Sequence, residues 1–351
     1  MTRYTPTHAK TGRCVARNRS NKRVGFAWGN GPMWDSVCVT VPYYIYKYDG
    51  KTDVLRENAD MIYRYLEYIS SKRDENGLVA IGLCDWSQPR KRGERISAPL
   101  ILTDSVTVYD IAVKSAFIFN IIAQTDRAEK AKKLAAEMKD SIRKHLRDYT
   151  SLTALGNCQT SQASPPHFAI FEMYETKNTY KRLKEFIAQK DDHAYCGMIG
   201  LRYIFELLAN SGDIDLALKM ICREDEPSYG SMIRRGAMGL CEITMENGLN
   251  ESENHHFLGD IVRIFHNFIA GLRVNPNMTD INEIIFAPII PSTLEYANGS
   301  FEFKKGTCEF GWERKDGSVI ANIAVPKNVH GYFIYGNKKL ALKEGINTFC
   351  L

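Results

Sequence analysis

The chain of 351 residues has no acidic residue in its first 34 positions, no Cys-x-x-Cys pair and no long apolar run. A membrane-spanning helix needs about 20 consecutive apolar residues, so the sequence predicts no membrane segment. Zinc sites and disulfide frameworks use close, regular cysteine spacings, so the nine scattered cysteines predict neither a metal site nor a disulfide framework. Their odd number, in a chain without a signal peptide, favours reduced thiols and a cytoplasmic location.

Charge is unevenly distributed along the chain. Residues 1–34 carry seven Lys or Arg side chains, whereas the whole chain has a formal net charge of +5, so the remainder is slightly acidic. A nucleic-acid-binding domain has a basic patch or stripe in its folded body, so we expect no nucleic-acid partner. We interpret residues 1–27 as a basic leader that is disordered or a non-native start; an arm that binds nucleic acid or a membrane is the alternative.

Apolar residues recur with a helical period between residues 35 and 272. In residues 51–72 they return at steps of three and four, as a helix with one buried face requires. Short turns join the expected helices into five hairpins. The pairs are 35–48 with 51–72, 104–124 with 126–148, 159–174 with 177–189, 196–210 with 213–223, and 228–235 with 255–272. Helical hairpins in this number predict an α/α toroid rather than an α/β sheet.

The pattern changes to a period of two after Arg273. Short runs of alternating residues are separated by Asn-Gly, Asp-Gly and Gly-Asn turn signals. The expected strands are 301–304, 308–312, 319–325 and 332–335. The sequence therefore predicts a helical domain at residues 28–272 and a small antiparallel β-sandwich domain at residues 273–351.

Four short islands combine aromatic and polar residues, as carbohydrate sites do, because an aromatic face stacks on a sugar ring while carboxylates and amides bind its hydroxyls. The islands are Trp28 to Asp35, Asp85-Trp86, Gln159-Thr160, and Pro227 to His256. Each also has a simpler interpretation. Trp28 and Trp34 fit a hydrophobic core, Asp35 fits a helix N-cap, and Asp85 fits a loop cap.

The order and spacing of these islands carry a resemblance to a known family. The motifs are Trp34-Asp35 at a helix start, Leu102-Thr-Asp-Ser105, Gln159-Thr-Ser161, the stretch Glu226-Pro-Ser-Tyr-Gly-Ser-Met-Ile-Arg-Arg-Gly-Ala237, then Glu242, and Asn254-His255. Together they resemble the bacterial α-L-rhamnosidases of glycoside hydrolase family seventy-eight. The resemblance implies a mainly α fold, an (α/α)6 toroid of helical hairpins flanked by β-sandwich domains. It also implies inverting removal of terminal L-rhamnose without a cofactor.

The resemblance also suggests roles for individual residues. Glu242 matches the proposed general base that activates water, and His255 matches a histidine that contacts the sugar hydroxyls. Trp34 and Asp35 match residues that line the rhamnose pocket. Asp85 and Trp86 match a loop at the pocket wall. Asp35, Asp85, Trp86, Glu242 and His255 are expected to face one concavity. Without the resemblance, Glu242 would be a solvated helix-end charge and His255 a cap or core residue.

Three departures qualify the resemblance. Met238-Gly-Leu-Cys241 stands where the family has Thr-Thr-(Ile/Leu)-Trp, and Pro165-Pro166 should interrupt a helix. An inverting glycosidase needs two carboxyl groups about 6.5–9.5 Å apart. The family's general acid lies upstream of the Trp-Asp motif, in a region that corresponds to residues 1–30, which contain no carboxylate.

Three hypotheses follow from the sequence. The first is a truncated α-L-rhamnosidase that acts on a rhamnose-containing oligosaccharide or glycoside and lacks both the first hairpin and the general acid. Its fold would be an incomplete (α/α)6 toroid. The second is a non-catalytic carbohydrate-binding or interaction protein on a decayed glycosidase scaffold. The third is an active relative in which Asp35 or Asp85 has become the acid. The aglycone, the linkage and the oligomeric state stay open.

Overall fold

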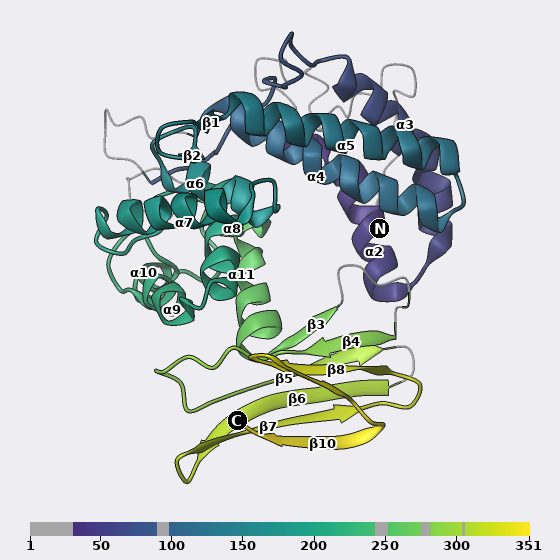
Figure 1. The fold of residues 1–351 in the computed structure, drawn as a ribbon. Helices are drawn as coiled ribbons and strands as arrows, with labels where there is room; N and C mark the ends of the chain where they lie inside the picture. Colours follow the sequence, from purple (N-terminus) through teal and green to yellow (C-terminus); the bar gives the residue numbers. More distant parts are fainter. Residues whose placement is uncertain (1–30, 90–97, 243–251, 275–279, 281, 304–305) are drawn as a thin grey trace. The chain divides into compact units, whose positions relative to one another are not determined.

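The computed structural model describes residues 31–89, 98–242, 252–274, 280, 282–303 and 306–351 (Figure 1). These residues divide into two compact units. The first unit lies within residues 31–46 and 51–204, and the second within residues 47–50 and 205–351. The predicted basic leader and Trp28 lie outside the described residues.

Helices dominate the chain up to residue 222, and the predicted hairpins are confirmed there. The helices are α1 Pro32–Asp35, α2 Val37–Asp49, α3 Thr52–Ser70, α4 Leu100–Ile121, α5 Thr125–His145, α6 Gln159–His167, α7 Met173–Ala188, α8 Met198–Asn210 and α9 Ile214–Cys222. A two-residue β-ladder, β1 Arg147–Asp148 with β2 Thr153–Ala154, connects α5 to α6.

The core of the first unit forms around α4, which is buried on nearly every side. Helices α3 and α5 each bury one apolar stripe and expose a charged face, as the spacing of their apolar residues predicts. The buried stripe of α3 includes Leu55, Ile62 and Ile69, all at 0% exposure. Burying each such side chain stabilises the fold by roughly 1.5–3 kcal/mol, so the long helices depend on this packing more than on helix propensity.

The helix predicted at residues 159–174 ends much earlier. Pro165 and Pro166 lie in the last turn of α6, which stops at His167. Proline has no N–H group, so these two residues cannot donate to the carbonyls one turn back. The chain instead turns at Ala169, whose φ of 52° is left-handed, and Ile170 N donates to Pro165 O at 3.0 Å. The predicted interruption by the two prolines is confirmed.

The helix predicted at residues 255–272 is not one regular α-helix. It consists of a 3₁₀ segment, η2 His256–Asp260, one short α segment, α11 Ile261–Arg263, and a π-helical segment, η3 Ile264–Ile269. Before it lies the short helix α10 Tyr229–Arg234, which Ser228 caps by accepting a hydrogen bond from Ser231 N at 2.9 Å.

Two four-stranded sheets form the C-terminal part of the second unit. Their strands are β3 Leu272–Val274, β4 Glu283–Phe286, β5 Tyr296–Phe303, β6 Gly306–Lys315, β7 Ser318–Val325, β8 His330–Tyr335, β9 Lys338–Ala341 and β10 Gly345–Cys350. One sheet has the order β10-β7-β6-β5 and is antiparallel, and the other has the order β3-β4-β8-β9. The prediction of a wholly antiparallel domain is wrong, because β4 and β8 pair in parallel.

Aromatic side chains fill the space between the two sheets. The rings of Phe333 and Phe349 stack with centroids 3.9 Å apart, and Phe286 packs against Phe333 at 5.7 Å. Trp312 is 3% exposed and donates its Nε1–H to the Ile269 carbonyl at 2.8 Å. This bond satisfies a buried polar group and joins the last π-helical residue to the sheet.

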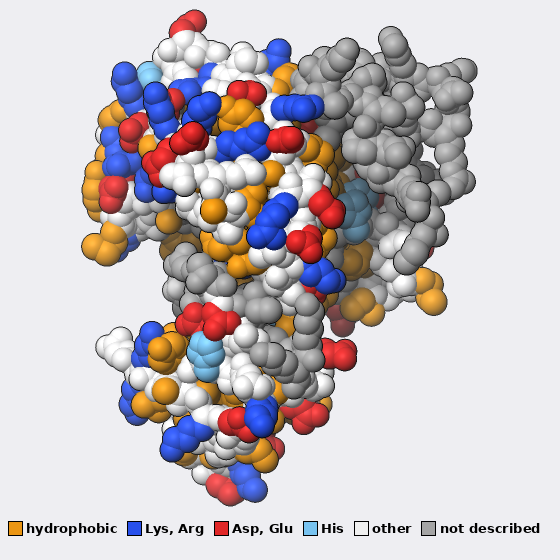
Figure 2. Space-filling view, turned by 90° about the vertical axis from the view of Figure 1, so that its right-hand side faces the viewer, with side chains coloured by type: hydrophobic (Ala, Val, Ile, Leu, Met, Phe, Trp, Pro, Cys, Tyr) orange, Lys and Arg blue, Asp and Glu red, His pale blue; other side chains and the backbone are white. Residues whose placement is uncertain are grey.

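The surface has no strong bias toward one sign of charge on the face that Figure 2 shows, where Lys and Arg side chains are interspersed with Asp and Glu over the helical part. No helix in the described ranges is long and apolar enough to cross a membrane. A cytoplasmic location stays a prediction from the sequence.

A fully buried carboxylate ties α5, β1 and α7 together. Glu175 has 0% side-chain exposure and forms ion pairs with Arg147 and with Arg143, the latter at 3.2 Å. It also accepts a hydrogen bond from the Glu172 backbone N–H at 2.7 Å, as the acidic residue of a capping box.

We expect Glu175→Gln to lower the free energy of unfolding by about 3 kcal/mol, because it removes the carboxylate that pairs with Arg147 and leaves Arg143 with Glu172 as its remaining partner. Urea denaturation should measure the loss. Glu129→Gln is the matched control, since Glu129 pairs with Lys132 at 63% side-chain exposure and should contribute less than about 0.5 kcal/mol. Equal small effects of the two substitutions would contradict the structural role of Glu175.

Candidate functional site

The six residues expected in a sugar site fall into two groups. Trp34, Asp35, Asp85 and Trp86 belong to the first unit, and Glu242 and His255 belong to the second. Each group is described within its own unit, and the convergence of Asp35, Asp85, Trp86, Glu242 and His255 on one concavity stays a prediction.

Glu242 and His255 lie side by side in the second unit. His255 Nε2 is 4.0 Å from Glu242 Oε1, and the two side chains are 19% and 29% exposed. Backbone hydrogen bonds also join the two segments that carry these residues. His255 N donates to Leu240 O at 2.8 Å, and Glu242 N donates to Ser252 O at 2.7 Å. The structure thus places Glu242 and His255 next to each other, and their roles in a sugar site stay a prediction.

In this arrangement the Glu242 carboxylate can accept a proton from a water molecule. Glu242 is partly exposed, so a solvent molecule can reach it, and the adjacent imidazole provides a second polar group within a few ångströms. The rings of His255 and His256 stack with centroids 5.6 Å apart. This stacking restricts the orientation of the His255 ring. A carboxylate beside a histidine at a solvent-accessible position is a suitable place for general base chemistry.

In the first unit, Trp34 and Asp35 belong to the four-residue helix α1. Its N-cap is Gly31, so the N-cap interpretation of Asp35 is wrong; Asp35 is the last residue of α1 and is 4% exposed. The start of α1 lies directly against Gly82, because a Cβ on Gly31 would overlap the Gly82 Cα. The absence of both side chains permits this close approach of two backbones.

Asp104 on α4 holds Gly82 in place. Its Oδ2 accepts hydrogen bonds from Ile81 N and Gly82 N, both at 2.7 Å, and the side chain is 2% exposed. Burial raises the pKa of Asp104 to about 6, against the two hydrogen bonds, which lower it. Asp104 thus fixes the backbone on which Gly31 packs, and through it the position of Trp34 and Asp35.

Asp85 is a buried helix cap rather than an exposed sugar ligand. It is 3% exposed and accepts hydrogen bonds from Thr160 Oγ1 and from three backbone N–H groups at the start of α8. The donors are Gly197 N at 2.8 Å, Ile199 N at 3.0 Å and Gly200 N at 3.2 Å. The sequence interpretation of Asp85 as a cap agrees with this geometry, and a direct contact with sugar stays a prediction.

Three thiols surround this carboxylate. Burial raises the pKa of Cys84, of Cys158 and, most strongly, of Cys196, and the negative charge of Asp85 raises each of them further. Burial also raises the pKa of Asp85 itself, while its four hydrogen bonds lower it. These thiols are therefore protonated at neutral pH and act as small apolar side chains.

Trp86 follows Asp85 and is 38% exposed, so part of its ring faces solvent. Its carbonyl accepts a hydrogen bond from Met198 N at 3.0 Å. The backbone of Trp86 is thus fixed by the same helix start that Asp85 caps. A ring that is half exposed on a rigid backbone can stack on a ligand without losing much conformational freedom.

No group of three or more His, Cys, Asp or Glu side chains within the described ranges is arranged to hold a metal ion. The residues discussed above also offer no cradle for an organic cofactor. The chemistry available to them is that of carboxylates, an imidazole and indole rings.

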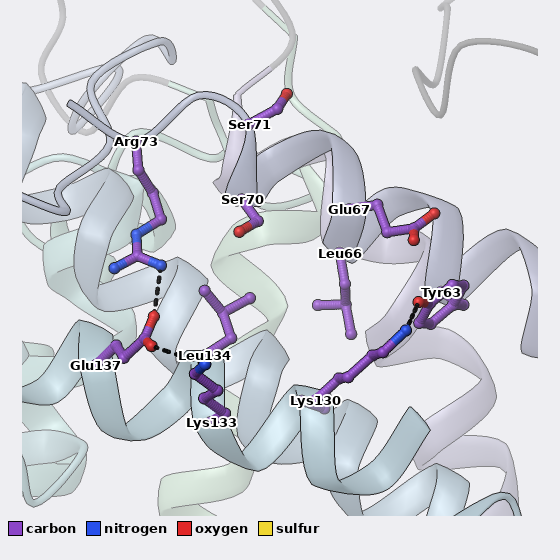
Figure 3. A pocket seen from close by; sticks show the side chains of 11 residues that line it. Tyr63, Leu66, Glu67, Ser70, Ser71, Arg73, Lys130, Lys133, Leu134 and Glu137 are labelled. Carbon is purple, nitrogen blue, oxygen red and sulfur yellow. Dashed lines mark hydrogen bonds and ion pairs between the residues drawn. The ribbon is translucent and has the colours of Figure 1, made fainter. Parts of the chain in front are cut away.

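A separate groove of about 530 Å³ lies between α3 and α5 (Figure 3), and none of its lining residues belongs to the predicted site. Arg73 pairs with Glu137 at 2.7 Å at one end, and Lys130 donates to Tyr63 Oη at 2.6 Å at the other. Its polar groups are largely satisfied by one another, so we interpret it as the seam between two packed helices.

Sequence reasoning assigned no role to Asp104, and it placed Thr160 only in an island with the character of a sugar site. The signal for Asp104 was a polar residue inside a largely apolar helical segment, which usually means a buried hydrogen bond. Because both side chains hold backbone or carboxylate groups of distant segments, their function became visible only with the fold.

Comparison with known proteins gives consistent matches along the chain. The model of the bacterial alpha-L-rhamnosidase 6 hairpin glycosidase domain matches residues 20–269, and that of the bacterial alpha-L-rhamnosidase C-terminal domain matches residues 274–339. An alpha-L-rhamnosidase of Alteromonas sp. strain LOR is 23% identical over 320 residues, covering 86% of this chain and 34% of the relative. The chain therefore spans about a third of the length of that relative.

Solved structures share the fold. The alpha-L-rhamnosidase from Dictyoglumus thermophilum has a TM-score of 0.86 at 22% identity, covering 97% of this chain and 41% of its own. The Streptomyces avermitilis alpha-L-rhamnosidase complexed with L-rhamnose has a TM-score of 0.81 at 18% identity, covering 91% of this chain and 33% of its own. The predicted fold class, helical hairpins followed by a β domain, is confirmed.

The raised pKa of Asp104 predicts a pH dependence of stability. The folded state holds the Asp104 proton more tightly than the unfolded state, so this stabilisation is complete below pH 4 and lost as pH rises through about 6. Asp104→Asn cannot titrate. The wild type should therefore lose stability relative to Asp104→Asn as the pH rises. The difference between their free energies of unfolding, wild type minus variant, should fall by up to about 3 kcal/mol across this range.

Denaturation curves at a series of pH values would measure this difference. Asp53→Asn is the control, because the Asp53 side chain is 88% exposed and should give no comparable trend. If the difference in free energy of unfolding between wild type and Asp104→Asn stays constant from pH 4 to pH 7, burial does not raise the pKa of Asp104.

Proposed function

Because the chain belongs to the bacterial α-L-rhamnosidase family, we propose that it acts on terminal α-L-rhamnosides, with Glu242 as the general base of an inverting hydrolysis. The observation that carries this proposal is the pair of Glu242 and His255, 4.0 Å apart and joined through their backbones. The sequence resemblance assigns the base and the sugar-contacting histidine to these same two positions.

In this reaction Glu242 takes a proton from a water molecule as the water attacks the anomeric carbon. His255 donates to or accepts from the sugar hydroxyls next to that water, which holds the ring in position. Because the water attacks from the face opposite the leaving group, the configuration at the anomeric carbon inverts. The leaving oxygen needs a proton from a second carboxyl group, for which the described residues offer no clear candidate.

The likeness to the Streptomyces avermitilis alpha-L-rhamnosidase complexed with L-rhamnose supports L-rhamnose as the sugar. Trp34, Asp35 and Trp86 are proposed as its contacts, from the resemblance and from the partial exposure of the Trp86 ring. An oligosaccharide or glycoside that ends in rhamnose is the proposed substrate.

Asp85 is a poor substitute for the missing acid. Four donors from within the protein occupy its two oxygens, so it cannot turn toward a departing oxygen without breaking the start of α8. This observation disfavours Asp85 as the acid in the third hypothesis and leaves Asp35 as the other candidate. If no acid acts, the chain binds rhamnosides without cleaving them efficiently, as a non-catalytic carbohydrate-binding protein.

The reaction can be tested with two substrates. General acid catalysis is typically worth about 10²–10⁴-fold, but a nitrophenolate leaves without a proton. We therefore expect turnover near background, detectable only with 4-nitrophenyl α-L-rhamnoside and abolished in Glu242→Gln, which keeps the shape but removes the base. Release of nitrophenol measures this rate.

Glu253→Gln is the matched control for this experiment, because Glu253 is an exposed glutamate two residues before His255. It should leave the rate unchanged. Rapid hydrolysis of a natural rhamnoside that persists in Glu242→Gln would contradict both the assignment of the base and the expectation that the acid is missing.

Trp86 and Asp85 should respond differently to substitution. Trp86→Ala removes a half-exposed ring and should weaken L-rhamnose binding about three- to tenfold, with little change in stability. Asp85→Asn replaces an acceptor with a donor opposite three N–H groups and should lower the unfolding midpoint. Calorimetric titration with L-rhamnose and thermal denaturation separate the two effects. Unchanged rhamnose affinity in Trp86→Ala would remove this residue from the site.

A further inference from the structure

The two ring nitrogens of His255 have different surroundings. Nε2 lies 4.0 Å from Glu242 Oε1, and the two side chains are partly exposed. Nδ1 is buried and has no hydrogen-bond partner among the described residues. We propose that the neutral His255 ring carries its proton on Nε2, and that His255 is therefore a hydrogen-bond donor in the sugar site.

The surroundings of Nδ1 disfavour a proton there. His255 is the N-cap of η2, but its side chain makes no capping hydrogen bond. The rings of His256 and Phe257 lie beside it, with centroids 5.6 and 5.7 Å away. A proton on Nδ1 would therefore be a buried N–H group without an acceptor, which costs free energy and is rare in folded proteins. With the proton on Nε2, the buried nitrogen has only a lone pair without a partner, and buried acceptors that lack a partner are somewhat more common.

The charge beside Nε2 leads to the same assignment. A carboxylate attracts the positive end of an N–H bond and repels a lone pair. The distance of 4.0 Å between His255 Nε2 and Glu242 Oε1 is too long for a direct hydrogen bond, but one water molecule or sugar hydroxyl can bridge it. With the proton on Nε2, the bridging oxygen accepts from His255 and donates to Glu242, so both contacts are favourable.

Backbone and side-chain hydrogen bonds hold His255 in this position. His255 N donates to Leu240 O at 2.8 Å, two residues before Glu242. On the other side, Leu258 N donates to His255 O at 3.2 Å, and Tyr229 Oη donates to Leu258 O at 3.2 Å. The segment that carries His255 is thus fixed both to α10 and to the segment that carries Glu242.

The assignment of the proton divides the roles of the pair, and this part of the inference rests on the proposed function. A protonated Nε2 has no lone pair that could accept a proton from water, so Glu242 is the group that accepts it. His255 instead donates to an oxygen, either that of the attacking water or that of a sugar hydroxyl. The sugar hydroxyl beside His255 is then bound as an acceptor.

The position of the proton can be measured without any enzymatic activity. Heteronuclear NMR of the histidine rings distinguishes a protonated ring nitrogen from an unprotonated one by its chemical shift. At about pH 8 an unperturbed histidine is neutral. We expect the His255 proton on Nε2 in an excess of at least roughly tenfold, because the other tautomer buries an unpaired N–H group.

His193 is the matched internal control. Its Nδ1 lies 2.9 Å from the Lys190 carbonyl oxygen, which can only accept, so the His193 proton should lie on Nδ1 in the same spectrum. The signals that vanish in His255→Gln and in His193→Gln assign the two rings. A His255 proton on Nδ1 would overturn the proposal, and so would a near-equal mixture of the two tautomers or a ring protonated on both nitrogens.

A second experiment tests the donor role in the sugar site. The side-chain N–H of glutamine reaches about as far as histidine Nε2, whereas that of asparagine ends near the position of Nδ1. In calorimetric titrations with L-rhamnose, His255→Gln should bind within about threefold of the wild type. His255→Asn should bind at least roughly tenfold more weakly, as expected for the loss of a hydrogen bond. Thermal denaturation checks that both variants are folded.

The outcomes separate this inference from the proposed function. Equal affinities of His255→Gln and His255→Asn for L-rhamnose would overturn the donor role of Nε2. A proton that moves to Nδ1 when L-rhamnose is bound would overturn it as well. A wild-type protein that does not bind L-rhamnose would refute the proposed function, and the NMR spectrum would still decide where the His255 proton lies.

Discussion

The carboxylate of Asp85 joins three segments that are far apart in sequence, and the first unit depends on this contact. Thr160 at the start of α6 and the backbone at the start of α8 both donate to it. A buried charge without such donors would cost several kcal/mol, so the donors must be present together. Gly197 and Gly200 follow from this requirement, because a Cβ at either position would overlap Asp85, Trp86 or Thr160. Asp85 and Thr160 belong to two of the islands that suggested sugar contacts. Their hydrogen bond therefore gives both islands a structural role.

The helical hairpins could be predicted from sequence because each depends on local periodicity. The apolar stripes of α3 and α5 are visible in a window of about 20 residues, and the two prolines mark the end of α6 locally. At residues 256–269 local periodicity did not identify the type of helix. Apolar residues at steps of three, four and five look alike in a short stretch, so the 3₁₀ and π segments were predicted as one α-helix.

The site was only partly predictable for a related reason. Glu242 and His255 are thirteen residues apart, and the family resemblance assigned both of them to the sugar site. Whether Asp85 was a cap or a sugar ligand depended on its burial, which is decided by α6 and α8 and not by its neighbours in sequence.

The parallel pairing of β4 with β8 has a consequence for how the C-terminal sheets form. Three strands of the other sheet, β5 to β7, lie between these two partners in the sequence. During synthesis β4 therefore leaves the ribosome before its partner β8. One edge of β4 stays unpaired until β5, β6, β7 and then β8 have been synthesised. The hairpins β5-β6 and β6-β7 can pair as they emerge, whereas the parallel ladder must wait for β8 and closes a longer loop than either hairpin, at a higher cost in loop-closure entropy. Nascent chains arrested before β8 should thus expose the edge of β4 to chaperones.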